Sequence, residues 1–556
     1  MTGTTDASNR PKWQGVAEAA LEVLPIVLVL LAVYGLYPIT PVPGGIDIPG
    51  PPEWGGFRDL LIEGPDAGQW ATNMERMAAG DYQHIDPHRM PTWLVLTAAL
   101  LNHGFGIVAA GHLVNRGMYV MCALGTYTVG RLAGGRMVGL VAAALALAHP
   151  HLQLCSQRFG IDAAVEASLP VALALGFLTA KRWWFGPITG FLIAWIAFIH
   201  HTALPYALPP LLAALLFGQP AWRRWAGLLL MLVGVAAGVW MVGQVFPIRS
   251  LEGIEMLLSE GARPGSTGNG NMAGPAVGDV IRANLSAKLP AMWAALSEQM
   301  MAWHLPDRTL YVLAGLGVIG PTALAPDKEG SRPMWRRFLG GLGPGLVILA
   351  CLAPLPVLAA VEAPPRYANN LMPFVALLVA RGGAMVVVGI ERVVHWFWRS
   401  WPVGIGVSAA GLAAAALTVR QPWMDAYPNN NVDEDIVGFY LLGDALDDAF
   451  ADGAKVACPV TEALFQAGLT GCNELRCPVT ADETAIVACL DSMKSGCSTD
   501  GYVGYVLLPG RQMYDPAMGG RTAMDVFVAG RFTAEKNISF GRFSAAVYRI
   551  PVDQMP

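Results

Sequence analysis

The chain has 556 residues, of which 54% are hydrophobic and 14% are charged, and its formal net charge is -5. Average globular domains carry about 25% charged residues, so this composition excludes an ordinary soluble enzyme and predicts a polytopic α-helical membrane protein. No basic tract is present, and the sequence therefore predicts no nucleic-acid partner.

Apolar runs recur along the chain. A bilayer core of about 30 Å requires roughly 20 apolar residues per helix. The runs predict about eleven transmembrane helices, near residues 17–37, 112–130, 137–150, 163–180, 186–200, 203–218, 226–246, 308–325, 338–360, 369–390 and 403–419. The apolar stretch from Leu94 to Ala110 competes as a further span, but counting it would reverse the charge pattern of all later loops. We expect a re-entrant or interfacial helix there.

Basic residues in short loops mark the cytoplasmic side of a membrane protein. They fall here at every second connection, at Arg131 and Arg136, Lys181 and Arg182, Arg223 and Arg224, the cluster within 328–337, and Arg392 and Arg399. This alternation predicts a multi-pass protein of the inner (cytoplasmic) membrane. Residues 1–16 would be cytoplasmic, residues 17–419 would form the transmembrane region, and residues 38–111 and 247–307 would be its large outer loops.

Residues 420–556 are more polar and contain five of the eight cysteines. The topology places this tail outside, where disulfides persist, and we expect two disulfides and one free thiol. A zinc site is disfavoured in the tail because no paired CxxC pattern or neighbouring histidine is present. Strands are expected at 454–460, 501–509, 524–530 and 543–551, with helices near 433–451 and 461–467. Together they predict a small extracytoplasmic α/β domain.

The first outer loop holds the first candidates for chemistry. Asp66 could take a proton from an attacking hydroxyl as a general base, although a solvated loop carboxylate or a helix N-cap explains it as simply. His88 and Arg89, beside Pro91, could bind a phosphate, with the arginine acting as a bidentate donor. They could equally anchor lipid headgroups.

Later outer connections hold further candidates. Asp162 follows Arg158 in CSQRFGID, and the two could form an ordinary surface ion pair. His201 ends an apolar segment, where polar side chains are often functional but can also reach water. Arg366 and Tyr367 lie on a short outer loop. Positive charge there runs against the charge rule, and a phosphate ligand would explain it.

The order of these features resembles the GT-C superfamily of integral-membrane glycosyltransferases, especially the protein O-mannosyltransferases and the aminoarabinose lipid A transferases. The resemblance is carried by the early Asp66, by HRMPTW, by RLAGGRMVGLVAAALALAHP followed by SQRFGID, and by PPRYANNLMPFVALLVA. It implies transfer of a sugar from a polyprenyl-phosphate donor to a lipid, protein or polysaccharide acceptor at the outer face, with inversion at the anomeric carbon.

The resemblance also implies roles for single residues. Asp66 would be the base, and Asp162 would support it. Charge developing on the leaving phosphate would be stabilised by a donor-binding group. Its members would be His88, Arg89, His201, Arg366 and Tyr367.

The sequence departs from the family pattern at two places. Asp66 is followed by Ala67, where many relatives have glutamate, and His200 and His201 stand where the family has lysine. We expect no metal and no cofactor, because no ligand cluster is evident. A transporter or lipid flippase is the main alternative, but it would show internal repeats and charged residues inside the spans, and neither is evident. A non-catalytic assembly protein with the same fold is the other.

Overall fold

The computed structural model describes residues 70, 73, 74, 76–80, 91–105, 107–147, 149, 151, 152, 155, 162–198, 206–217, 220–245, 277–301, 303, 307–321, 334–360, 368, 370–397, 456–458, 474–476, 487, 502–509, 523–540 and 543–551. The expected first and last spans, 17–37 and 403–419, lie outside this set. So do the expected helices at 433–451 and 461–467.

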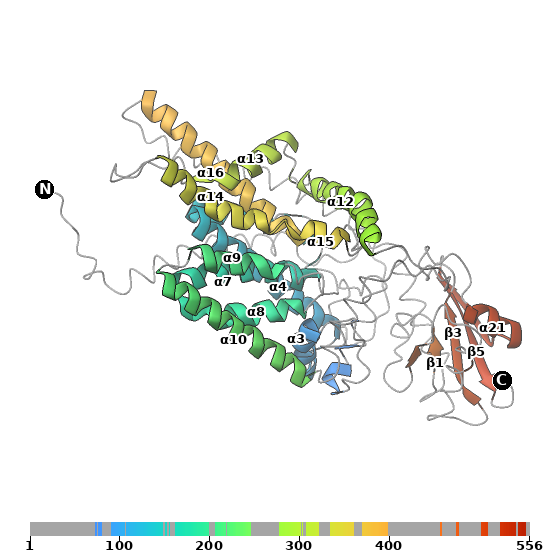
Figure 1. Cartoon of the computed structure of the whole chain (residues 1–556). Coiled ribbons are helices and arrows are strands. Elements are labelled where there is room, and N and C mark those ends of the chain that lie inside the picture. Colours follow the sequence, from blue (N-terminus) through green and yellow to red (C-terminus); the bar gives the residue numbers. More distant parts are fainter. Residues whose placement is uncertain are drawn as a thin grey trace.

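Most of the expected spans that lie among the described residues coincide with helices (Figure 1). These are α4 (Ile107–Gly134), α5 (Arg136–Leu147), α7 (Asp162–Lys181), α8 (Gly186–Ala197), α9 (Leu208–Phe217), α10 (Ala221–Val245), α13 (Asp307–Ile319), α14 (Met334–Ala350) and α16 (Met372–Phe397). Within the described residues, four helical stretches are long and apolar enough to cross a membrane: Ala163–Lys181, Ala221–Val242, Gly340–Ala359 and Met372–Ile390. The fold is thus mostly helical, while the total of eleven spans stays a prediction.

Helix α3 (Pro91–Asn102) occupies the ambiguous stretch after the first loop. Its twelve residues extend about 18 Å, which is too short for a bilayer core of about 30 Å. Trp93, Leu94 and Thr97 are buried, and the helix packs against α4. The Trp93 indole N–H donates to Asn115 Oδ1 of α4 at 2.8 Å, which fixes α3 to the helical body.

The expected span 338–360 corresponds to the stretch Gly340–Ala359, which is long and apolar enough to cross a membrane but contains an irregular turn. Helix α14 ends at Ala350, a turn occupies residues 351–353, and α15 (Pro354–Ala360) continues the segment. Pro354 has no N–H to donate to the preceding turn, so it ends one helix and is suited to start the next.

Helix α12 (Val277–Met301) lies inside the segment expected to be a large outer loop, which is a difference from the prediction. Its apolar residues are concentrated in its second half, where Met292, Leu296 and Met300 are buried. It packs against α15, as Figure 1 shows. Polar residues in the first half hid the helical pattern.

Helices α8 and α10 approach closely because small residues line their contact. A methyl group added at Gly190 of α8 would collide with the backbone of Met231, and one added at Gly234 of α10 would collide with the backbone of Pro187. Such glycines allow membrane helices to pack backbone to backbone. Two other residues of α10, Trp225 and Trp240, are 66% and 67% exposed. Such exposure is expected of a helix surface that faces lipid.

Arg381 is a fully buried cation in α16. Its guanidinium donates to the carbonyl oxygens of Gly317 in α13 at 2.7 Å and Gly341 in α14 at 2.8 Å, and to that of Ala133 in α4. The expectation that no span contains a charged residue is therefore wrong here, and Glu166 in α7 and Arg116 in α4 are further exceptions. All three lie inside runs that are apolar overall.

The C-terminal part forms a five-stranded sheet in the order β2-β1-β3-β5-β4, from β1 (Val456–Cys458), β2 (Glu474–Arg476), β3 (Tyr502–Pro509), β4 (Lys536–Phe540) and β5 (Phe543–Pro551). Strand β1 pairs in parallel with β2 and β3, whereas β5 is antiparallel to β3 and β4. The sheet lies at the end of the helical body where α12 and α15 also lie (Figure 1).

One expected strand in this region is wrong. Residues 524–530 belong to helix α21 (Ala523–Arg531), whose Phe527 and Val528 are buried. Apolar residues at 524, 527 and 528 fit the helical period, although the valines at 526 and 528 also favour a strand. Cys458 belongs to β1, and its side chain lies outside the described set, as do the other four tail cysteines. The expected disulfides therefore remain predictions.

Candidate functional site at the start of helix α7

The end of α5 is fixed by two side chains from distant parts of the chain. The Tyr119 hydroxyl of α4 donates to the Leu147 carbonyl, and the Trp303 indole N–H donates to the Leu145 carbonyl at 3.2 Å. The last carbonyls of a helix have no partner within the helix, so these bonds satisfy groups that would otherwise be buried without one. They hold the start of the connection between α5 and α7 in place.

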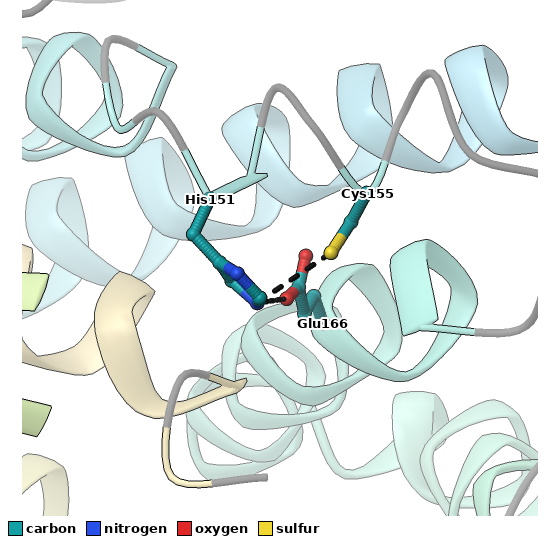
Figure 2. A group of neighbouring side chains, drawn as sticks. All are labelled: His151, Cys155 and Glu166. Carbon is teal, nitrogen blue, oxygen red and sulfur yellow. Dashed lines mark hydrogen bonds and ion pairs between the residues drawn. The ribbon is translucent and has the colours of Figure 1, made fainter. Parts of the chain in front are cut away.

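Three chemically active side chains meet beside this connection (Figure 2). His151 and Cys155 come from the connection, and Glu166 comes from α7. His151 Nε2 lies 2.9 Å from Glu166 Oε1 and 3.5 Å from Cys155 Sγ. One ligand atom from each of the three residues lies within 4.8 Å of the other two.

This group is well buried. The Glu166 side chain is 3% exposed and that of His151 is 17% exposed, and Cys155 is also buried. The sequence neighbours of Glu166 in α7, Ala163, Ala164, Val165 and Ala167, are buried as well. A buried carboxylate is stabilised by a positive partner. Protonated His151 is one such partner, and a bound cation would be another.

His149 lies next to the group. It is fully buried, its Nε2 lies 3.0 Å from the Gln299 carbonyl oxygen, and its ring meets Trp303 edge to face with centroids 5.5 Å apart. A carbonyl accepts but never donates, so Nε2 carries the proton and Nδ1 presents a lone pair in the neutral ring. Nδ1 has no hydrogen-bond partner among the described residues.

Asp162 is the one predicted site residue whose backbone is described. It is the first residue of α7, and its side chain is not described. Position 162 lies one helical turn before Glu166 on the same face of α7. The other predicted site residues lie outside the described set: Asp66, His88, Arg89, His201, Arg366 and Tyr367.

Two tryptophans of the expected first outer loop contact each other. Trp70 and Trp93 pack edge to face, with ring centroids 5.7 Å apart and an interplanar angle of 72°. Both indoles are buried. In the sequence, His88 and Arg89 lie between these two tryptophans.

Sequence reasoning did not identify His151, Cys155 or Glu166. A signal for part of the group was present, because positions 151 and 155 are one helical turn apart and Glu166 interrupts an apolar run. Nothing in the sequence indicated that the connection folds back so that Cys155 and His151 face Glu166.

No protein-family model matches the sequence, and no curated protein matches it. Among solved structures, ArnT from Cupriavidus metallidurans bound to undecaprenyl phosphate is similar, with 14% identity and a TM-score of 0.55 over 97% of this chain and 99% of that one. AglB from Archaeoglobus fulgidus, with an inhibitory peptide and a dolichol-phosphate, has 11% identity and a TM-score of 0.47 over 98% and 77%. The mycobacterial arabinofuranosyltransferase AftD has 13% identity and a TM-score of 0.48 over 96% and 41%. The assignment of the fold rests on ArnT.

Proposed function

Because the chain has the GT-C fold that it shares with ArnT, we propose that it is a glycosyltransferase that moves a sugar from a polyprenyl-phosphate donor to an acceptor. The supporting observation is that the likeness runs over nearly the whole length of both chains, and that ArnT was solved with undecaprenyl phosphate bound. The acceptor would be a lipid, a protein or a polysaccharide.

We place the reaction at the outer face of the inner membrane. The charge pattern assigns residues 1–16 to the cytoplasm and residues 420–556 to the outside. Support for this proposal comes from the sheet, α12 and α15, which lie at one end of the helical body (Figure 1) and belong to or adjoin the expected outer regions. Disulfides among the tail cysteines belong to the same proposal.

Asp66 is the proposed base, and Asp162 supports it. Asp66 precedes Trp70 by four residues, and Arg89 precedes Trp93 by four residues. Trp70 and Trp93 contact each other edge to face. This contact is consistent with the proposal that the base and a phosphate ligand belong to one site.

The proposed donor-binding group consists of His88, Arg89, His201, Arg366 and Tyr367. Arginine can hold two phosphate oxygens at once and stabilises the charge that develops as the carrier lipid leaves. Arg366 and Tyr367 directly precede Ala368 and the buried Asn370, which lead into α16. Their place in the sequence, next to the start of a buried helix, supports a positioning role for the short outer loop.

The reaction is proposed to be one displacement. Asp66 takes the proton from the acceptor hydroxyl while the oxygen attacks the anomeric carbon from the side opposite the phosphate. The bond from that carbon to the phosphate oxygen breaks, and the polyprenyl phosphate leaves with the electron pair. A single attack from the opposite side inverts the anomeric centre.

The test is transfer of radiolabelled sugar from polyprenyl-phosphate donors to a membrane extract by the purified full-length protein. We expect Asp66→Asn to reduce transfer by about 10²–10⁴-fold, as for loss of a general base. Glu63→Gln is the matched control because it removes a carboxylate from the same loop segment, and it should keep wild-type transfer. Equal transfer by wild type and Asp66→Asn would refute the assignment of the base.

The alternatives predict different results. A transporter or flippase would move a solute or lipid between compartments without forming a glycosidic product. An assembly protein would show no transfer with any donor, and Asp66→Asn would leave its phenotype unchanged. Glu166 and Arg381 do not favour transport, because the described contacts of Arg381 are to main-chain carbonyls and those of Glu166 include His151.

A further inference from the structure

We propose that His151, Cys155 and Glu166 bind one transition-metal ion of the Zn²⁺ class. The three side chains offer an imidazole nitrogen, a sulfur and a carboxylate oxygen, all within 4.8 Å of one another, from two separate segments of the chain. Figure 2 shows the three side chains pointing toward a common centre. None of these three residues is assigned a role in the proposed transfer reaction.

The distances suit a small ion. Zn²⁺ binds nitrogen and oxygen ligands at about 2.0–2.2 Å and sulfur at about 2.3 Å, so ligand atoms around a tetrahedral ion lie roughly 3.3–3.8 Å apart. His151 Nε2 is 2.9 Å from Glu166 Oε1 and 3.5 Å from Cys155 Sγ. Moving the side chains by a few tenths of an ångström would admit the ion.

The donor types and their charges also suit a zinc-like ion. A mixed nitrogen, sulfur and oxygen set matches a borderline-soft cation and fits the harder Mg²⁺ or Ca²⁺ poorly. Ionised Glu166 and the thiolate of Cys155 would together neutralise a divalent ion, with neutral His151 as third ligand. A net-neutral complex offsets the cost of burying the charge of Glu166, whose side chain is 3% exposed. Three protein ligands leave one position for water.

The metal would have a defined structural effect. It would join the connection after α5 to the first turns of α7, one turn from Asp162. This inference departs from the sequence-based expectation of no metal, because the sequence does not show that these three residues meet. It does not rest on the proposed glycosyl transfer, since the binding of metal can be measured without a sugar donor.

The test uses the full-length protein in detergent, stripped with a chelator and then titrated with Zn²⁺ or Co²⁺. We expect about one tightly bound ion at this site and, with Co²⁺, a thiolate-to-metal charge-transfer absorption that requires cysteine ligation. Cys155→Ser should abolish that absorption and lower the affinity by more than the 10–100-fold typical of losing an outer-shell partner. His151→Asn and Glu166→Gln should lower the affinity similarly.

Cys351→Ser is the matched control, because Cys351 is also buried but its thiol contacts the Val347 carbonyl oxygen. It should keep wild-type affinity and absorption. A folded wild type that shows no thiolate absorption with Co²⁺ would overturn the proposal, even if the variants fail to fold. Unchanged affinity and absorption in Cys155→Ser would overturn it too. If the protein binds the metal but transfers no sugar from any donor, the metal site is supported and only the proposed function is refuted.

Discussion

Replacing Arg381 with methionine should destabilise the helical body strongly. Arg381 joins α16 to three other helices through the carbonyls of Ala133, Gly317 and Gly341. Methionine fills a similar volume along the stem but has no donor. The substitution therefore removes the hydrogen bonds while largely preserving the packing.

The magnitude follows from the position of the acceptors. Ala133 and Gly317 lie in the last turns of α4 and α13, where main-chain carbonyls have no intrahelical partner. Leaving a buried polar group unsatisfied costs about 1–3 kcal/mol, so the two carbonyls predict a loss of about 2–6 kcal/mol. Removing the buried guanidinium recovers part of its desolvation cost. We expect a net loss of about 3 kcal/mol of folding free energy.

The assay is reversible unfolding of the purified protein in mixed micelles, followed by tryptophan fluorescence. Arg308→Met, at an exposed position at the start of α13, is the matched control and should change stability by less than about 0.5 kcal/mol. The stability of Arg381→Lys should lie between those of the wild type and Arg381→Met. One ammonium group cannot reproduce the planar guanidinium, which contacts three helices. If Arg381→Met unfolds within about 1 kcal/mol of the wild type, the carbonyl contacts are not what stabilises this junction.

Two further predictions concern contacts between helices. Gly190→Ala should force α8 and α10 apart, because its methyl group meets the Met231 backbone, and should lower the apparent melting temperature, whereas Gly117→Ala, with open space around it, should not. An unchanged melting temperature for Gly190→Ala would contradict the close contact. Trp93→Phe should lose the bond to Asn115 Oδ1, destabilise the protein by about 1 kcal/mol and increase proteolysis near α3. The same protease sensitivity in both proteins would argue against this anchor.

Much of the helical body could be predicted because membrane spans are selected by length and hydrophobicity, and both are local properties of the sequence. Helix α7, for example, begins and ends within one residue of the predicted span 163–180. The break before Pro354 and the helix Val277–Met301 were missed. The break depends on one residue within a long apolar run, and α12 is held by tertiary contacts of its second half.

The candidate metal group could not be predicted for a different reason. His151 and Cys155 are close in sequence, but their contact with Glu166 depends on how the connection after α5 turns back to α7. Arg381 was overlooked likewise, because its partners lie on three other helices. Local composition carries no information about such tertiary contacts. Asp66 remains a prediction from family resemblance.

The attachment of α12 to the end of α5 also bears on how the protein is made. Trp303 bonds to Leu145 across 158 residues, and Gln299 bonds to His149 across 150 residues. At roughly 5–20 residues per second, a ribosome needs on the order of 8–30 s to supply these partners after α5 has emerged. During that interval the nascent chain lacks the hydrogen-bond partners of the Leu145 carbonyl and of His149 Nε2. Nascent chains stalled before residue 299 should therefore be preferred substrates for membrane quality-control proteases.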